Sequence, residues 1–168
     1  MSTDKENRSE TILVVDDSQI NVRILSNMLE RQGYDVLQAK DGATALIMAA
    51  DMLPMLILLD INMPDMDGYT VCKTLKQSTT TAHIPVIFIS ALDEIVDKVK
   101  AFSVGGVDYI TKPFQLAEVL ARVQTQLQIY QLQQELLQAN QSLQASNREL
   151  DAFAHTVAHD LRSPLNNI

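Results

Sequence analysis

Residues 56–64 read LILLDINMP, in which four apolar residues without polar alternation lead directly to an aspartate, Asp60. A short apolar run of this kind is typical of a strand buried on both faces of a parallel sheet. The sequence holds five runs rich in Val, Ile and Leu, at residues 12–15, 34–37, 55–59, 86–89 and 107–110. We therefore predict five strands.

The segments between these runs have the periodicity of helices. They cover residues 18–32, 42–52, 68–76 and 94–102. In the first of them Ile20, Ile24 and Met28 recur at four-residue steps, and Gly33 is placed to end the helix. Alternation of strand and helix predicts an α/β fold, a doubly wound five-stranded parallel sheet with helices on both faces. No internal repeat is visible, which excludes a solenoid.

Composition restricts the class of protein further. With 13 basic against 21 acidic residues and a net charge of −8, the chain lacks the basic surplus that a nucleic-acid partner requires. The apolar stretch 52–59 is broken by Pro54 and is too short to span a membrane, and residues 1–10 are too charged for a secretory signal. A single cysteine, Cys72, excludes an internal disulfide. We expect a soluble cytoplasmic protein without membrane or nucleic-acid contacts.

Polar residues follow four of the five predicted strands. Asp16 and Asp17 follow the first strand, Asp60 the third, Ser90 the fourth and Lys112 the fifth. Ligands of open parallel sheets bind beyond the carboxyl ends of the strands, where these side chains should meet. One such aspartate alone is most often a turn or cap residue, but the whole set is hard to explain in that way. Three carboxylates suit Mg²⁺, a lysine and a hydroxyl suit phosphoryl oxygens, and a carboxylate can itself become an aspartyl-phosphate.

With these motifs together, residues 11–127 resemble a response-regulator receiver domain, a flavodoxin-like fold. The resemblance runs through residues 14–18 (VVDDS), 59–64 (LDINMP), 67–68 (DG), 84–87 (IPVI), 90–91 (SA) and 112–114 (KPF). It implies that Asp60 accepts the phosphoryl group. It also implies that Asp17, Asp60 and the backbone carbonyl of Asn62 coordinate Mg²⁺, with Asp16 acting through water.

The same resemblance assigns the remaining receiver residues. Ser90 and Lys112 would hold the phosphoryl oxygens, and the Lys112–Pro113 bond would be cis. Tyr109 stands where the family keeps an aromatic switch residue, so that movement of Ser90 toward phosphate would let Tyr109 reshape the surface of the fourth and fifth helices. Asp67 is better explained as a helix N-cap than as a ligand.

A second part of the chain follows, because residues 115–160 contain neither glycine nor proline. Leu116, Val119, Leu120, Val123 and Leu127 form the stripe of a helix packed on the sheet. From there a heptad pattern begins, with a positions Ile129, Leu136, Leu143, Leu150 and Val157 and d positions Leu132, Ala139, Ser146 and Phe153. This seam predicts a parallel dimeric coiled coil, hence a homodimer, with a weak point at Ser146.

Residues 153–165, FAHTVAHDLRSPL, resemble the H-box of a histidine-kinase dimerisation and phosphotransfer domain. The resemblance implies that His159 is a phosphoacceptor, that Asp160 is its general base and that Pro164 bends the helix. Ser163 stands where the family often has Thr or Asn, which leaves phosphatase activity open. His155 lies one helical turn before His159, but a zinc site lacks a third ligand in the sequence.

These resemblances together predict the N-terminal part of a hybrid histidine kinase. Its expected organisation is a disordered leader at 1–10, a receiver at 11–127, a coiled-coil helix at 128–152 and the start of a phosphotransfer domain at 153–168. No glycine-rich nucleotide loop is present, so the ATP-binding domain would lie outside this sequence. The expected partners are this missing kinase domain and a phosphodonor, either a histidine kinase or a phosphotransfer protein.

Two further classes of function remain open at this point. The chain could be a phosphorylation-dependent dimerisation module without kinase output. It could also be a phosphatase of the haloacid-dehalogenase type, although that class requires an aspartate where Asn62 stands. A continuous helix from Gln115 to His159 would advance about 66 Å, so we expect Asp60 to regulate the kinase rather than to take phosphate from His159 of its own chain.

Overall fold

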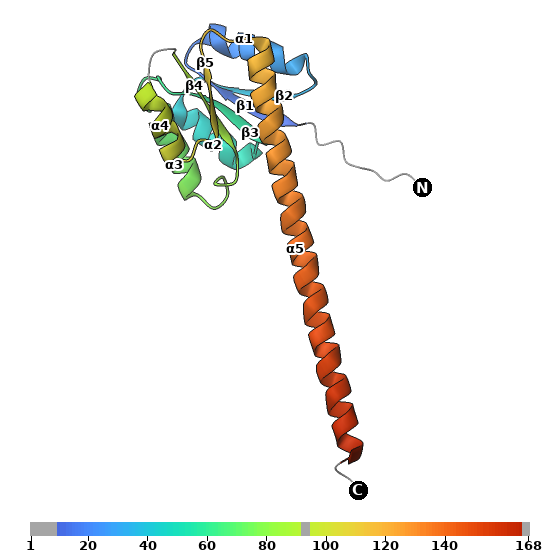
Figure 1. Ribbon diagram of the computed structural model, residues 1–168. Helices are drawn as coiled ribbons and strands as arrows, with labels where there is room; N and C mark the ends of the chain where they lie inside the picture. Colours follow the sequence, from blue (N-terminus) through green and yellow to red (C-terminus); the bar gives the residue numbers. More distant parts are fainter. Residues whose placement is uncertain (1–9, 92–94, 166–168) are drawn as a thin grey trace. The chain divides into compact units, whose positions relative to one another are not determined.

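The computed structural model describes residues 10–91 and 95–165, and within them the five predicted strands form one parallel sheet (Figure 1). The order across the sheet is β2-β1-β3-β4-β5. The strands are β1 (Thr11–Val15), β2 (Asp35–Ala39), β3 (Leu56–Asp60), β4 (Val86–Ser90) and β5 (Asp108–Thr111). The strand order reverses beside β1, which is the switch point where ligands of such sheets bind. The predicted α/β fold class is confirmed.

Five helices connect and cover this sheet. They are α1 (Gln19–Glu30), α2 (Gly42–Met52), α3 (Gly68–Gln77), α4 (Ile95–Ser103) and α5 (Leu116–Leu165). Helices α2, α3 and α4 contribute buried side chains to one hydrophobic cluster, and α1 together with the start of α5 contributes to the other. The two clusters lie on opposite faces of the sheet, so the fold is doubly wound as the sequence predicts.

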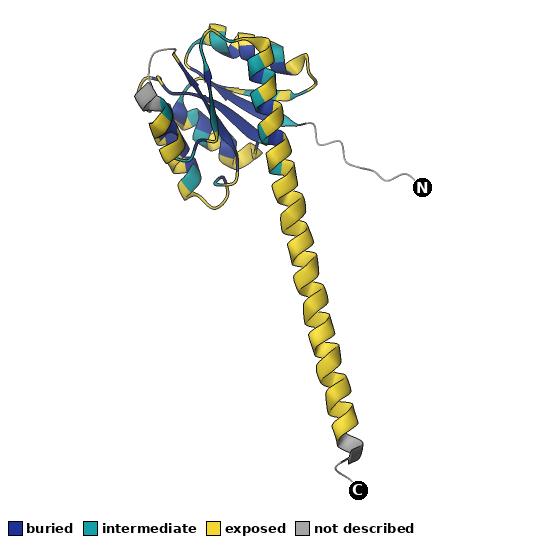
Figure 2. Cartoon of the chain, in the orientation of Figure 1, coloured by how far each residue is buried: buried dark blue, intermediate teal, exposed yellow. Residues whose placement is uncertain are grey.

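The strands fill both clusters because their side chains alternate between the two faces. Leu13, Ile57 and Phe88 belong to the cluster covered by α2–α4, whereas Leu58 and Ile87 belong to the one covered by α1 and α5. All five are at most 1% exposed, and the central strands β1, β3 and β4 are accordingly dark blue in Figure 2. This double burial explains why β3 (LILLD) and β4 (VIFIS) carry no polar residue before their last position, whereas the edge strands β2 and β5 are partly buried and include Asp35, Gln38 and Asp108.

Most element boundaries lie within one residue of the sequence prediction, and two elements, β2 and α1, end two residues away from it. The second strand is Asp35–Ala39 instead of 34–37, because its pairing with β1 continues until Ala39 lies opposite Val15. Helix α1 ends at Glu30, and Gly33 adopts a φ of 92° in the turn that follows. Glu94, predicted to begin the fourth helix, and residues 1–9 of the predicted leader lie outside the described residues.

The chain divides into two compact units, residues 1–127 and residues 128–168, which are described separately. In the second unit the helical backbone continues through Ser146 to Leu165. Every residue from Gln131 to Arg162 is exposed, and Figure 2 shows this part of α5 in yellow. Large apolar side chains of the predicted seam are among them, with Leu136 63% and Leu143 62% exposed. No helix within residues 10–91 and 95–165 has the length and apolar character needed to cross a membrane.

Candidate functional site

Three carboxylates meet at the carboxyl edge of the central strands. Asp16 directly follows β1, Asp60 is the last residue of β3, and these neighbouring strands pair Val15 with Leu59. Oxygens of Asp16, Asp17 and Asp60 all lie within 4.8 Å of one another. Asp16 is 0% and Asp60 2% exposed, whereas Asp17 is exposed. The strand-end aspartates singled out in the sequence are thus brought together, with Asp17 on the solvent side.

Lys112 supplies a positive charge to this cluster. Its Nζ atom lies 3.2 Å from Oδ1 of Asp60 and 3.3 Å from Oδ2 of Asp16. The lysine is held in place because its backbone N–H donates a 2.8 Å hydrogen bond to the carbonyl of Ser90. Ser90 ends β4 next to the end of β3 and is 8% exposed, and the Lys112–Pro113 bond is cis, as expected. Polar residues at the carboxyl ends of β1, β3, β4 and β5 therefore lie at the same edge of the sheet.

The cluster has an unfavourable charge balance. Burial, and after it the negative charge of Asp16, raises the pKa of Asp60 from its ordinary 3.8 to about 6. The ammonium group of Lys112 opposes both effects without cancelling them. The negative charge of ionised Asp60 is therefore poorly compensated. A group that brought positive charge to this edge of the sheet would be bound favourably.

The chemistry of the ligand set fits a magnesium ion. Three carboxylates offer oxygen atoms only, and one of them is exposed, so that an ion could keep part of its water shell. Asn62, whose carbonyl is predicted to be a further ligand, lies two residues after Asp60 and is exposed. Residues Asp17, Asp60 and Asn62 would hold the ion, which would neutralise charge as a phosphoryl group approaches.

Sequence reasoning missed Asn21, a residue at the start of α1. Its Nδ2 group donates a 3.0 Å hydrogen bond to Oδ2 of Asp16, and the backbone N–H of Ser18 donates a 2.8 Å bond to Oδ1. Both oxygens of the buried carboxylate thus have a donor from the first turn of α1. An asparagine in the first turn of a predicted helix, five residues after a strand-end aspartate, was the only sequence signal.

In the loop after β3, the prediction of a helix N-cap is confirmed. Asp67 is the N-cap of α3, and its carboxylate accepts a 2.7 Å hydrogen bond from the backbone N–H of Thr70, which lowers the pKa of Asp67. Gly68 then lies against the phosphoacceptor candidate, because a Cβ atom on it would be 2.3 Å from the carbonyl oxygen of Asp60. This backbone contact is invisible in the sequence.

Tyr109, the predicted switch residue, lies between α4 and α5. Its ring makes an edge contact with Phe102 at a centroid distance of 6.1 Å. Lys98 Nζ lies 4.3 Å from the ring centroid, and the guanidinium of Arg122 on α5 lies 5.5 Å from it. Arg122 is itself fixed by a 2.8 Å ion pair with Asp108, the neighbour of Tyr109 on β5. The aromatic ring is therefore in direct contact with the helix that leaves the receiver.

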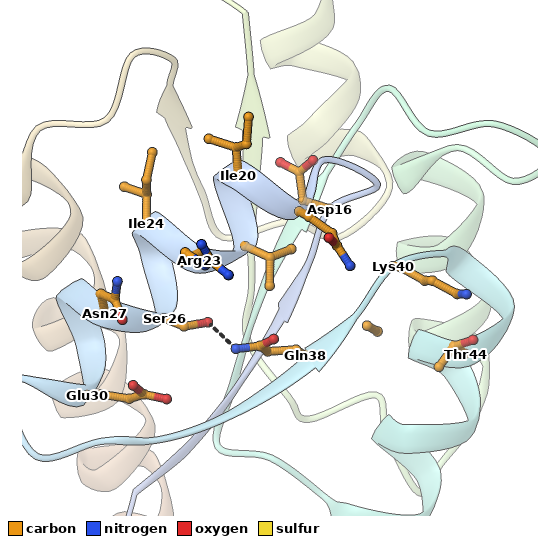
Figure 3. A pocket seen from close by; sticks show the side chains of 13 residues that line it. Asp16, Ile20, Arg23, Ile24, Ser26, Asn27, Glu30, Gln38, Lys40 and Thr44 are labelled. Atoms are coloured by element: carbon orange, nitrogen blue, oxygen red, sulfur yellow. Dashed lines mark hydrogen bonds between the residues drawn. The ribbon is translucent and has the colours of Figure 1, made fainter.

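A groove of about 760 Å³ runs between α1 and β2 and reaches Asp16 (Figure 3). Its floor includes the 2.9 Å hydrogen bond from Gln38 to the hydroxyl of Ser26, drawn as a dashed line. Arg23 and Lys40 also line it. The groove borders the carboxylate cluster only at Asp16 and adds no further ligand to it.

In the second unit, the H-box candidates are exposed on α5. Nδ1 of His159 lies 3.7 Å from the carboxylate of Asp160, and both side chains are 75% exposed. Among the described residues the group of three or more potential metal ligands is Asp16, Asp17 and Asp60, so His155 and His159 belong to none. The side chains of Ser163 and Pro164 lie outside the described part.

Comparison with known proteins agrees with this geometry. The response regulator receiver domain family matches residues 12–124, and the chain belongs to this family. The response regulator PleD of Caulobacter vibrioides is 44% identical over 150 residues, covering 89% of this chain and 32% of its own. The transcriptional regulator RpaA of Synechocystis is 45% identical over 116 residues, covering 69% of this chain and 48% of its own.

Solved structures resemble the same part of the chain. A putative response regulator from Chloroflexus aurantiacus is 34% identical, with a TM-score of 0.70 over 71% of this chain and 98% of its own. The receiver domain of a signal transduction histidine kinase from Syntrophus aciditrophicus is 33% identical, with a TM-score of 0.67 over 71% of this chain and 91% of its own. The chain spans about a third to a half of the length of these curated relatives. What it shares with them is the receiver domain of two-component signalling.

Proposed function

We propose that residues 11–127 accept a phosphoryl group on Asp60 in a Mg²⁺-dependent reaction and pass the change to α5. The observation that carries this proposal is the meeting of three carboxylates and Lys112 at one edge of the sheet, with Asp60 almost completely buried. An oxygen of Asp60 attacks the phosphorus of a phosphohistidine or an acyl phosphate, and the bond from phosphorus to the donor breaks. The phosphodonor is a histidine kinase or a phosphotransfer protein.

The remaining residues bind and orient the phosphoryl group. Lys112 already lies 3.2 Å from Oδ1 of Asp60, within reach of oxygens attached there, and Ser90 ends the adjacent strand. Asp17, Asp60 and the carbonyl of Asn62 would hold Mg²⁺, and Asp16 would act through water. Formation of the aspartyl-phosphate adds negative charge and acceptor oxygens, which attract Lys112 and Ser90 away from their present positions.

The test is labelling by acetyl phosphate followed by intact mass spectrometry. We expect the wild-type chain to gain one phosphoryl group in Mg²⁺ and none in EDTA. Asp60→Asn should abolish the gain, while Asp51→Asn, which changes an exposed aspartate on α2, should leave it unchanged. Full labelling of the Asp60→Asn variant would show that the phosphoacceptor has been assigned wrongly.

For the second unit we propose a parallel homodimeric coiled coil over residues 128–152 that leads into a histidine phosphotransfer segment at 153–168. Support comes from the heptad spacing and from the exposure of its leucines, which have no partner within the described chain. The H-box resemblance makes His159 the phosphoacceptor and Asp160 its general base. Phosphorylation of Asp60 would then regulate a histidine kinase whose ATP-binding domain is elsewhere.

The alternative is a dimerisation module without kinase output. It is favoured by the names of several relatives, which are response regulators and transcriptional regulators. A cognate kinase ATP-binding domain with radiolabelled ATP decides between the two. The kinase proposal requires acid-labile label that is lost in His159→Gln and kept in His155→Gln, whereas the alternative requires no label on either histidine.

A further inference from the structure

We propose that Asn21 is a positioning residue for phosphorylation of Asp60, because its side-chain amide fixes the carboxylate of Asp16. The inference deepens the proposed function and rests on it. Asn21 belongs to none of the motifs that identify the site, and its side-chain amide donates its hydrogen bond to Asp16. Its contribution therefore passes through a single hydrogen bond.

The hydrogen bond from Asn21 holds Oδ2 of Asp16 in place. Oδ2 of Asp16 has two polar partners, a 3.0 Å hydrogen bond from Nδ2 of Asn21 and a 3.3 Å ion pair with Nζ of Lys112. Lys112 is shared, because the same Nζ atom lies 3.2 Å from Asp60. When Lys112 turns toward a phosphoryl oxygen, Asn21 remains as the donor that keeps Oδ2 in place. Without it, Oδ2 of a carboxylate that is 0% exposed would lose its donor when the phosphoryl group arrives, and the bond from the backbone N–H of Ser18 to Oδ1 would hold the carboxylate at one oxygen alone.

The start of α1 presents the amide in the required direction. Ser18 caps the helix, and its hydroxyl accepts a 3.5 Å hydrogen bond from the backbone N–H of Asn21. The side chain of Asn21 is consequently not needed for capping and extends back over the N-terminus toward Asp16. An aspartate here would place a second negative charge at the buried carboxylate, and a leucine would leave Oδ2 without this donor.

The experiment compares variants of the full chain in two measurements. The first is the dissociation constant for Mg²⁺ alone, measured by calorimetry on the unphosphorylated protein. The second is the rate constant for labelling by acetyl phosphate at saturating Mg²⁺. Asn21→Leu removes the donor at similar volume, Asn21→Gln retains an amide, and Asn27→Leu is the matched control, an exposed asparagine farther along α1. Asn21→Ala serves if the leucine variant does not fold.

We expect Asn21→Leu to weaken Mg²⁺ binding and to slow labelling, each by about tenfold or more, as loss of an orienting partner does at metal sites. Asn21→Gln should recover most of both, and Asn27→Leu should match the wild type. A lower melting temperature with both measurements within about twofold of the wild type would overturn the proposal and leave only a structural role for Asn21.

The outcomes also separate this inference from the proposed function. If the wild type binds Mg²⁺ but is not labelled on Asp60, the proposed function fails, and the Mg²⁺ titrations still decide the role of Asn21. If the wild type is labelled and Asn21→Leu behaves like it, only the inference fails. A wild type that does not bind Mg²⁺ refutes both.

Discussion

Replacing Asp60 with asparagine should stabilise the receiver at neutral pH in the absence of metal. Burial and the charge of Asp16 raise the pKa of Asp60 from 3.8 to about 6, so ionising this carboxyl group costs more in the folded than in the unfolded chain. The shift of about two units corresponds to about 3 kcal/mol at pH 7.5. Asparagine has the same shape and a side-chain oxygen that can still accept from Lys112, but it carries no charge.

The sign of the pH dependence follows from the raised pKa. Well below pH 3.8 Asp60 is protonated in both states, and its burial does not lower the stability of the wild type. As pH rises from about 4 to about 6 the unfolded chain releases this proton first, so the free energy of unfolding of the wild type falls relative to the variant. The advantage of Asp60→Asn should therefore be small at pH 4, about half its full value at pH 5, and level above pH 7.

Urea denaturation in EDTA, followed by far-UV circular dichroism, measures this difference at each pH. Asp51→Asn is the control, because its carboxylate is exposed and the change should alter stability by less than about 0.5 kcal/mol. Added Mg²⁺ should stabilise the wild type and reduce the advantage of the variant. A destabilised Asp60→Asn variant, or an advantage independent of pH, would refute the description of Asp60 as a poorly compensated buried carboxylate.

Two other changes probe backbone packing at the site and the predicted seam. Gly68→Ala should lower the free energy of unfolding by about 1–3 kcal/mol in urea denaturation, because its Cβ would lie 2.3 Å from the carbonyl oxygen of Asp60. A loss below about 0.5 kcal/mol would mean that the loop simply shifts. The double change Leu136→Asp/Leu143→Asp should give a monomer in sedimentation equilibrium, whereas Leu137→Asp, outside the heptad seam, should remain dimeric. If the double variant remained dimeric, the dimer interface would have to lie on another surface of the protein.

The residues that could be predicted from sequence are those whose position depends on the sheet alone. Asp16, Asp60, Ser90 and Lys112 each follow a strand, and parallel strands bring their carboxyl ends to a common edge whatever the side-chain rotamers are. The central strands β3 and β4 were recognisable because burial on both faces removes polar residues before the last position. The end of β2 was not, since it depends on the pairing of Ala39 with Val15.

What could not be predicted depends on contacts between separate elements. Asn21 reaches Asp16 by bending its side chain back over a helix N-terminus, which neither helical nor strand periodicity encodes. Gly68 meets the carbonyl of Asp60 only once α3 packs beside β3. The cations Lys98 and Arg122 beside Tyr109 come from two helices whose relative placement no local pattern specifies.

The charge imbalance of the site is connected to α5 through Lys112, β5 and Tyr109. Three carboxylates face one ammonium group, so the cluster is poised to accept a dication and then a phosphoryl group that draws Lys112 toward itself. The backbone of Lys112 directly follows β5 and is bonded through its N–H to the carbonyl of Ser90, and Tyr109 lies three residues earlier, within β5. The ring of Tyr109 contacts Arg122 of α5. Under the proposed function, an electrostatic change at Asp60 thus reaches the output helix through one strand, without requiring the carboxylate cluster and that helix to touch.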